Sequence, residues 1–145
     1  MTCGVADVGP ESFEGSPVGA HSSITTLRAW AHIDLSAIES NIARLAEAAP
    51  GAELLSVVKA DGYGHGLVPV AQASRRAGAQ WLGVALLEEA LTLRAAGDDG
   101  PILAWLPTPG DRFDECIRLG IDLGVAAPWM LTEISHAAAA VGRPA

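Results

Sequence analysis

The sequence is almost without lysine. Eight of its nine basic residues are arginines, which leaves Lys59 as the only lysine, and the only tyrosine, Tyr63, follows four positions later. Set against 17 acidic residues, this gives a formal net charge of −8. Such a balance excludes the clustered basic surface that binds nucleic acid. The chain also lacks any run of about 18 apolar residues, so no membrane span is predicted.

Cysteine is also rare, and the two cysteines, Cys3 and Cys116, lie in dissimilar contexts without paired spacing. This fits a reducing cytoplasm better than a disulfide framework. Residues 1–25 are rich in glycine, serine, proline and acids, and they lack the basic and apolar regions of a signal peptide. We therefore expect a disordered leader over residues 1–26, an organised part over residues 27–145, and a cytoplasmic location.

Several common site motifs are missing. There is no G-x-x-x-x-G-K-[ST] phosphate loop and no G-x-S-x-G elbow. The glycines of GYGHG, residues 62–66, do not form the dinucleotide fingerprint, because the third glycine comes one residue early. His32, His65 and His136 are too scattered for a zinc site. We interpret each histidine as structural or exposed, and we predict no metal site.

Apolar runs and helical patterns alternate along the organised part. Residues 30–35 alternate like a short strand, and Ser36 with Glu39 forms a capping-box pattern for a helix that Pro50 and Gly51 end. Further on, the pattern predicts four strand–helix units. The strands are expected at 54–58, 81–85, 101–106 and 121–126, and the helices that follow them at 68–77, 88–96, 111–119 and 128–141.

The spacing of these units predicts the fold class. The strands start near 54, 81, 101 and 121, which are 27, 20 and 20 residues apart. Units of this length indicate an α/β fold with parallel strands and right-handed crossovers. A (β/α)8 barrel of the TIM type needs eight units and about 250 residues, so we predict the N-terminal part of such a barrel, about four βα units, with open sheet edges. A complete four-stranded doubly wound domain is the competing fold.

The stretch SVVKADGYGHG, residues 56–66, carries the candidate site. Lys59 falls where a strand ends and its βα loop begins, which is the catalytic face of such barrels. Loss of hydration in an enclosed apolar site favours the neutral amine, which can form a Schiff base with an aldehyde. Pyridoxal phosphate is the cofactor that needs this chemistry. The alternative is a lysine that extends from the strand end into water.

The loop after Lys59 supports the first interpretation. Gly62, Gly64 and Gly66 let the backbone turn sharply and approach a ligand closely. Tyr63 offers a hydroxyl on a rigid arm, which suits a phosphate oxygen. An aromatic side chain that only packs within the loop is the alternative for Tyr63.

Residues 57–66 closely resemble the pyridoxal-phosphate attachment site of alanine racemases. Residues 30–42 resemble the opening of the same family, and residues 86–97 also resemble it. The resemblance covers about residues 27–145, while the leader does not match. It identifies the chain as the N-terminal portion of a member of that family.

The resemblance implies roles for particular residues. By it, Lys59 is both the Schiff-base lysine and one of two catalytic bases, and Tyr63 binds the cofactor phosphate. Trp105 falls where the family places a large apolar residue beside the cofactor ring, and a place in the barrel core is its alternative. Gly62 replaces the alanine more usual in the motif, a change expected to loosen the loop without removing chemistry.

The resemblance also implies a homodimer that interconverts L-alanine and D-alanine and so supplies D-alanine for peptidoglycan. The family takes its second base, a tyrosine, from a β-rich C-terminal domain of the partner subunit, which lies beyond this sequence. The only tyrosine here is Tyr63, so we expect the chain alone not to racemise alanine. Another pyridoxal-phosphate barrel protein, either a broad-specificity amino-acid racemase or a non-catalytic binding protein, is the alternative.

Overall fold

The computed structural model describes residues 29–145, so the predicted leader over residues 1–26 lies outside the described residues. Residues 29–34 form neither helix nor strand, and the strand predicted over residues 30–35 is therefore wrong. Alternating apolar and polar residues indicate that an extended segment would have two different faces. They do not provide the neighbouring strand whose hydrogen bonds a β-strand requires. The four strands of the described sheet all come later in the chain.

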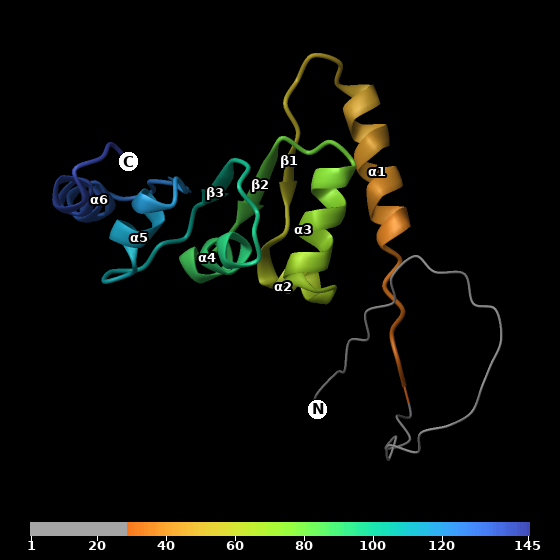
Figure 1. Ribbon diagram of the computed structural model, residues 1–145, viewed down its shortest axis with the longest axis horizontal. Coiled ribbons are helices and arrows are strands. Elements are labelled where there is room, and N and C mark those ends of the chain that lie inside the picture. Colours follow the sequence, from red (N-terminus) through yellow and green to blue (C-terminus); the bar gives the residue numbers. More distant parts are fainter. Residues whose placement is uncertain (1–28) are drawn as a thin grey trace. The chain divides into compact units, whose positions relative to one another are not determined.

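The first helix, α1 (Leu35–Ala48), begins one residue before Ser36. Ser36 therefore lies inside the first turn, and the capping position predicted for it is wrong. The helix ends before Pro50 and Gly51, as predicted, because proline cannot continue the helical hydrogen bonding. It buries Ile42 and packs beside α3 (Leu67–Arg76) (Figure 1).

Four parallel strands form the sheet, in the order β1-β2-β3-β4. They are β1 (Leu55–Val57), β2 (Trp81–Val84), β3 (Ile102–Ala104) and β4 (Asp122–Leu123). Each strand lies within the range predicted for it, and all three pairings are parallel. The predicted parallel sheet is confirmed, with β1 and β4 as its outer strands.

A helical segment follows every strand. After β1 come α2 (Lys59–Gly64) and α3, and the later strands are followed by α4 (Leu87–Ala95), α5 (Phe113–Arg118) and α6 (Pro128–Val141). The bounds of α3, α4 and α6 match the predicted ranges to within a residue, whereas α5 starts two residues late. In the described part of the chain, none of these helices has the length and apolar character to cross a bilayer.

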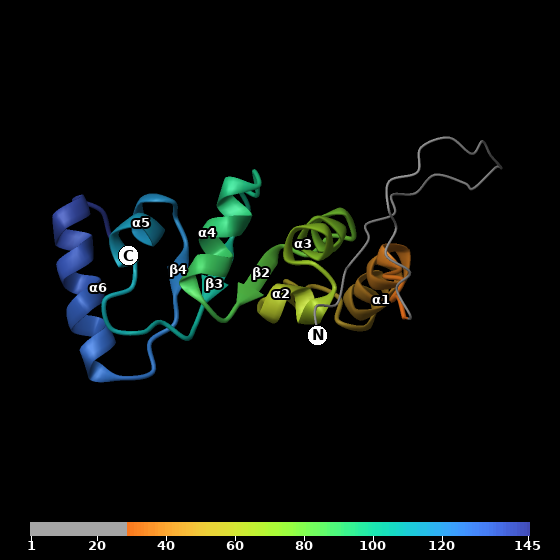
Figure 2. The ribbon, with the colours of Figure 1, turned by 90° about the horizontal axis from the view of Figure 1, so that it is seen from below.

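Helices α3, α4 and α5 lie on one face of the sheet (Figure 2). The residues at the strands that face them are fully buried and belong to one apolar cluster with the helices: Val58, Leu82, Val84, Ile102 and Ala104. Burying a leucine or isoleucine side chain contributes roughly 1.5–3 kcal/mol, so this cluster is the main source of stability.

The opposite face of the sheet is open. Leu55 and Val57 point to it and remain 38% and 37% exposed. They alternate with Ser56, whose hydroxyl lies 2.8 Å from that of the buried Ser74 on α3. Strands in sequence order with helices on one face form the wall of a barrel, whereas helices cover both faces of a doubly wound sheet. The predicted barrel part is confirmed, and the competing fold is not observed.

An ion-pair network ties the loops at the amino ends of the strands. Arg75 forms a bidentate pair with Asp98, because its Nε and Nη2 each donate to one carboxylate oxygen at 2.9 Å. Nη2 also donates to the carbonyl of Pro101, directly before β3. Arg94 on α4 donates to the carbonyls of Asp98 and Gly100 at 2.9 and 2.8 Å. These charge-assisted contacts fix the turn that leads into β3.

Candidate cofactor site

Lys59 stands directly after the first strand, at the carboxyl end of the sheet. The N–H of Val58 donates to the carbonyl of Gly83 at 2.8 Å, which extends the pairing of β1 and β2 by one residue. Val58 is buried, whereas Lys59 is half-buried. The position predicted for the lysine, at a strand end where a βα loop begins, is confirmed.

The backbone after Lys59 winds into a left-handed turn. Ala60, Asp61, Gly62 and Tyr63 have φ values of 55–61° and ψ values of 36–52°. An L-residue in this conformation costs roughly 1–2 kcal/mol, and only glycine enters it freely. Three of the four residues are not glycine, so the turn is strained and persists because surrounding contacts hold it. The glycines predicted a sharp turn, but nothing in the pattern predicted that their neighbours would share the left-handed conformation.

Gly62 packs closely against α3. The residue is buried, and a Cβ at this position would lie 3.0 Å from Cγ2 of Val70 and 3.2 Å from its Cβ. The absence of a side chain therefore lets the turn approach the helix. The comparison with the family motif, which suggested a looser loop, did not anticipate this packing.

Two side chains brace the turn from within the loop. Oδ1 of Asp61 accepts the N–H of Leu67, the first residue of α3, at 2.7 Å. Nδ1 of His65 lies 2.8 Å from the carbonyl oxygen of Gly62. His65 is thus a structural histidine, as predicted, although it lies next to the candidate site.

The structure brings Lys59 and Tyr63 together. Nζ of Lys59 lies 4.9 Å from the centroid of the Tyr63 ring, a cation–π contact worth about 0.5–1 kcal/mol at an exposed site. Tyr63 is 57% exposed, so its ring does not fill the interior of the loop. An amine and a phenol hydroxyl are therefore available side by side at one end of the sheet.

Trp105 follows β3, and its ring packs on the open face of the sheet. If the strand pairings are continued past the strand ends, Lys59, Ala85 and Trp105 lie at the same height along the strand direction. A Cβ on Gly83 would lie 2.8 Å from ring carbon Cζ3 of Trp105, and one on Gly124 would lie 2.8 Å from Cβ of Trp105. Two glycines thus make room for the tryptophan. These are the contacts that a barrel-core residue makes, and the role of Trp105 beside a cofactor stays a prediction.

Sequence reasoning missed Glu89, which joins two loops. Its Oε1 accepts the N–H of Ala60 at 2.5 Å, and its Oε2 accepts the N–H groups of Ala85 and Leu86 at 3.1 and 3.0 Å. One carboxylate therefore connects the loop after β1 to the loop after β2. The sequence could have indicated only the contact with Leu86, because a glutamate three residues after a helix cap is the second member of a capping box. Its contact with Ala60, 29 residues away, had no signal.

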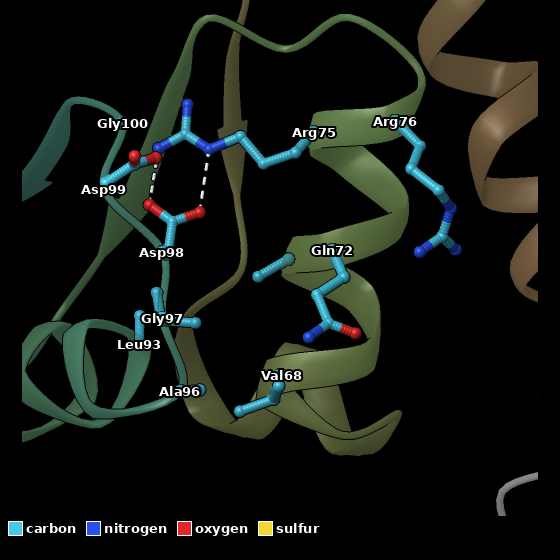
Figure 3. Close-up of a pocket in the computed structure, with 11 residues that line it drawn as sticks. Val68, Gln72, Arg75, Arg76, Leu93, Ala96, Gly97, Asp98, Asp99 and Gly100 are labelled. Carbon is cyan, nitrogen blue, oxygen red and sulfur yellow. Dashed lines mark hydrogen bonds and ion pairs between the residues drawn. The ribbon is translucent and has the colours of Figure 1, made fainter.

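A pocket of about 380 Å³ lies on the helix side of the sheet, between α3 and the loop after α4 (Figure 3). Figure 3 shows Arg75 facing Asp98 there, while Arg76 points away. Arg76 pairs with Glu39 of α1 at 2.7 Å. Because both arginines are paired with carboxylates, and because Lys59 and Tyr63 do not line this pocket, we do not assign the site to it.

The described residues, 29–145, contain no group of three or more side chains placed to hold a metal ion. Cys116 is fully buried on α5, and burial raises the pKa of its thiol to about 12. A thiol with so high a pKa stays protonated and is a poor nucleophile. Cys116 is therefore a packing residue.

Comparison with known proteins places the chain beside one set of relatives. Residues 33–145 match the family described as the N-terminal domain of alanine racemase. The chain is 56% identical to the alanine racemase of Thermobifida fusca over 117 aligned residues. These residues make up 81% of this chain and 31% of the relative. It is 58% identical over 113 residues to the alanine racemase of Beutenbergia cavernae, which covers 78% and 30%.

Solved structures agree with these relatives. The alanine racemase from Streptomyces coelicolor A3(2) matches with a TM-score of 0.75 at 50% identity, over 78% of this chain and 30% of that one. The alanine racemase from Bacillus anthracis with bound L-Ala-P matches with a TM-score of 0.65 at 39% identity, over 70% and 26%. The chain spans about 30% of the length of the curated relatives that it matches.

Proposed function

The chain belongs to the family of the alanine racemase N-terminal domain, and from this membership we propose that it supplies the cofactor-anchoring part of a pyridoxal-phosphate-dependent alanine racemase. The proposed reaction is the interconversion of L-alanine and D-alanine, which supplies D-alanine for peptidoglycan. Relatives that share more than half of the aligned residues bear the name alanine racemase. Because the chain spans about 30% of their length, the proposal concerns the role of this segment within a whole enzyme.

One observation carries the proposal: the amine of Lys59 lies against the ring of Tyr63 on a strained left-handed turn. This pair suits pyridoxal phosphate, because a primary amine can bond its aldehyde carbon and a phenol hydroxyl can donate to a phosphate oxygen. Both residues follow the carboxyl end of β1, the end of the strands where barrels carry their sites. Strained backbone of this kind is concentrated at functional sites.

Racemisation requires a proton to leave the α-carbon on one side and to return on the other. Pyridoxal phosphate, when bound, supplies an electron sink that makes the α-proton acidic. In our proposal, Nζ of Lys59 holds and returns the proton on one side, while Tyr63 fixes the phosphate. Tyr63 is the only tyrosine of the chain. The family resemblance implies that the base on the other side is a second tyrosine, which a partner subunit provides in a homodimer.

We extend the proposal to Trp105, to the domain organisation and to the location. Trp105 is level with Lys59 and lies over the open face of the sheet, which supports a place in the wall of the cofactor site. Residues 27–145 would form the N-terminal portion of the cofactor-binding barrel, with residues 1–26 as a leader outside it. The free thiol of Cys116 fits a reducing cytoplasm.

A chimera tests the proposal. Residues 33–145 replace the matching segment of the Streptomyces coelicolor enzyme, to which the chain is 50% identical. With pyridoxal phosphate added, the chimera is expected to form D-alanine from L-alanine. Lys59→Arg should abolish this activity, because a guanidinium stays protonated and cannot attack an aldehyde. Arg44→Lys, at an exposed position of α1, is the control and should leave it unchanged. Equal turnover by the Lys59→Arg chimera would contradict the proposal.

A further inference from the structure

Glu89 occupies the third position of α4 and binds the backbone of two neighbouring loops. Its Oε2 accepts the N–H of Leu86, the residue before the helix, and Leu86 makes no side-chain cap of its own. Its Oε1 reaches Ala60 in the loop after β1. All its partners are N–H donors, so the position requires two acceptor oxygens. The amino end of a helix also favours a negative charge.

Ala60 is one of the three non-glycine residues of the left-handed turn, and it is the one that Glu89 contacts. It is the first left-handed residue after Lys59, with φ 55° and ψ 52°. The conformational penalty of one L-residue in this region and the contribution of one hydrogen bond to a charged acceptor are of similar size. The contact with Glu89 therefore offsets the strain at Ala60. Because Ala60 follows Lys59 directly, a change in its backbone would redirect the lysine.

Asp61 and His65 also brace the turn, but their partners, Leu67 and Gly62, lie in the same loop or at the start of the next helix. Glu89 comes from a different βα unit. Its contact therefore also sets the position of the turn relative to the barrel wall.

We propose that Glu89 is a positioning residue for the site. By holding Ala60 in the left-handed conformation and tying it to the loop after β2, Glu89 sets where the amine of Lys59 lies against Tyr63. It acts through the backbone. The effect on the loop stands on the hydrogen bonds alone, whereas its consequence for cofactor attachment rests on the proposed function.

The test compares Glu89→Gln with Glu88→Gln in the complete 145-residue chain. Glutamine keeps the length of the side chain but has one acceptor oxygen instead of two. If the glutamine oxygen keeps accepting the N–H groups of Ala85 and Leu86, the cap of α4 is preserved. The NH2 group of the glutamine then faces the N–H of Ala60, and because both are donors the hydrogen bond to Ala60 is lost. Glu88 is the neighbouring residue on the same helix and is exposed, so its variant controls for the lost charge.

Two readouts need no cofactor. Exchange of the Ala60 amide is expected to accelerate about tenfold in Glu89→Gln, since one hydrogen bond is lost. The buried amides of Leu82 and Ile102 should keep their rates. Lys59 is the only lysine, so its side chain gives a single set of NMR signals. Because Nζ of Lys59 lies 4.9 Å from the centroid of the Tyr63 ring, these signals are expected to be displaced by the ring. They should move toward unfolded values in Glu89→Gln but not in Glu88→Gln.

The third readout is the covalent labelling of Lys59 by pyridoxal phosphate and borohydride, which should decrease in Glu89→Gln. Faster Ala60 exchange and shifted lysine signals in Glu89→Gln would support the role of Glu89. If the unsubstituted chain takes no label at Lys59, the proposed function is overturned, even when those two changes are seen. An unchanged Ala60 amide with an unchanged lysine signal would overturn the role of Glu89, whatever the labelling shows.

A rescue variant keeps the proposal testable if Glu89→Gln does not fold. Glycine enters the left-handed region freely, so Ala60→Gly removes the strain that Glu89 offsets. The double variant Glu89→Gln/Ala60→Gly is therefore expected to fold and to recover the lysine signal of the unsubstituted chain. If the double variant folds no better and its lysine signal stays altered, Glu89 serves some purpose other than the conformation of Ala60, and the proposal is wrong.

Discussion

Replacing Gly62 by alanine is expected to destabilise the chain at one defined contact. Gly62 has φ +61°, and the new methyl group would lie 3.0 Å from Cγ2 of Val70. The left-handed conformation costs an alanine roughly 1–2 kcal/mol, and its restriction of the unfolded chain returns about 0.4–1 kcal/mol. Crowding in a packed site adds about 1–3 kcal/mol. The free energy of unfolding should therefore fall by about 1–4.5 kcal/mol.

Gly64→Ala is the matched control for this prediction. Gly64 has φ +81°, but nothing lies within 4 Å of its would-be Cβ, so its substitution isolates the conformational penalty. Trimming Val70 should relieve the contact, and Gly62→Ala/Val70→Ala is expected to lose about 1 kcal/mol less than the sum of the single variants. Urea unfolding followed by circular dichroism gives each value. A loss in Gly62→Ala no larger than in Gly64→Ala would refute the packing argument.

Three further predictions concern the proposed phosphate contact of Tyr63, the buried thiol of Cys116, and the contacts of Arg75 that fix the turn before β3. If Tyr63 binds the phosphate as proposed, Tyr63→Phe removes a hydrogen bond to a charged group, worth roughly 1.5–3 kcal/mol. A fluorescence titration should then show pyridoxal phosphate binding about tenfold to a hundredfold more weakly, whereas unchanged affinity would assign Tyr63 to packing. Burial raises the pKa of the Cys116 thiol from 9.0 to about 12. As the pH rises, the thiol therefore ionises in the unfolded chain before it does in the folded chain. The free energy of unfolding should fall between pH 9.0 and about 12. That contribution should vanish in Cys116→Ala, and urea unfolding across this pH range measures it. Gly100→Ala places a methyl group 2.6 Å from Cζ of Arg75. Asp98 and the carbonyl of Pro101 hold this guanidinium in place, so the change should cost about 1–3 kcal/mol. A variant as stable as the original would show that the guanidinium can move aside without loss of its contacts.

The sheet and its helices were predictable because their signals are local. Apolar runs bounded by Pro101 or Gly51 mark the strands, and a proline at the first position with a glycine after the end marks α6. The length of the strand–helix units, with strand starts 27, 20 and 20 residues apart, then implies parallel strands. Residues 30–35 carry a similar alternating signal, yet they form no strand. Strand formation also depends on a partner, which a local pattern does not specify.

The candidate site was predictable in its residues but not in its geometry. The strand-end position of Lys59 and the nearby glycines pointed to the loop after β1, where the structure brings Lys59 and Tyr63 together. The left-handed conformation of Ala60, Asp61 and Tyr63 opposes their intrinsic preferences, so no propensity could indicate it. One of the contacts that brace the turn comes from Glu89, in the next βα unit, and such long-range hydrogen bonds become visible only once the units are assembled.

Borohydride reduction can show whether Lys59 is the attachment point of pyridoxal phosphate. Because Lys59 is the only lysine, the chain offers one side-chain amine besides its amino terminus. The folded chain is incubated with an equimolar amount of pyridoxal phosphate, reduced and mapped by peptide mass spectrometry, beside the same chain in urea. We expect a label on Lys59 that forms faster in the folded chain than in urea and is lost in Lys59→Ala. Labelling of the amino terminus with Lys59 unmodified, or equal labelling of Lys59 in urea, would contradict it.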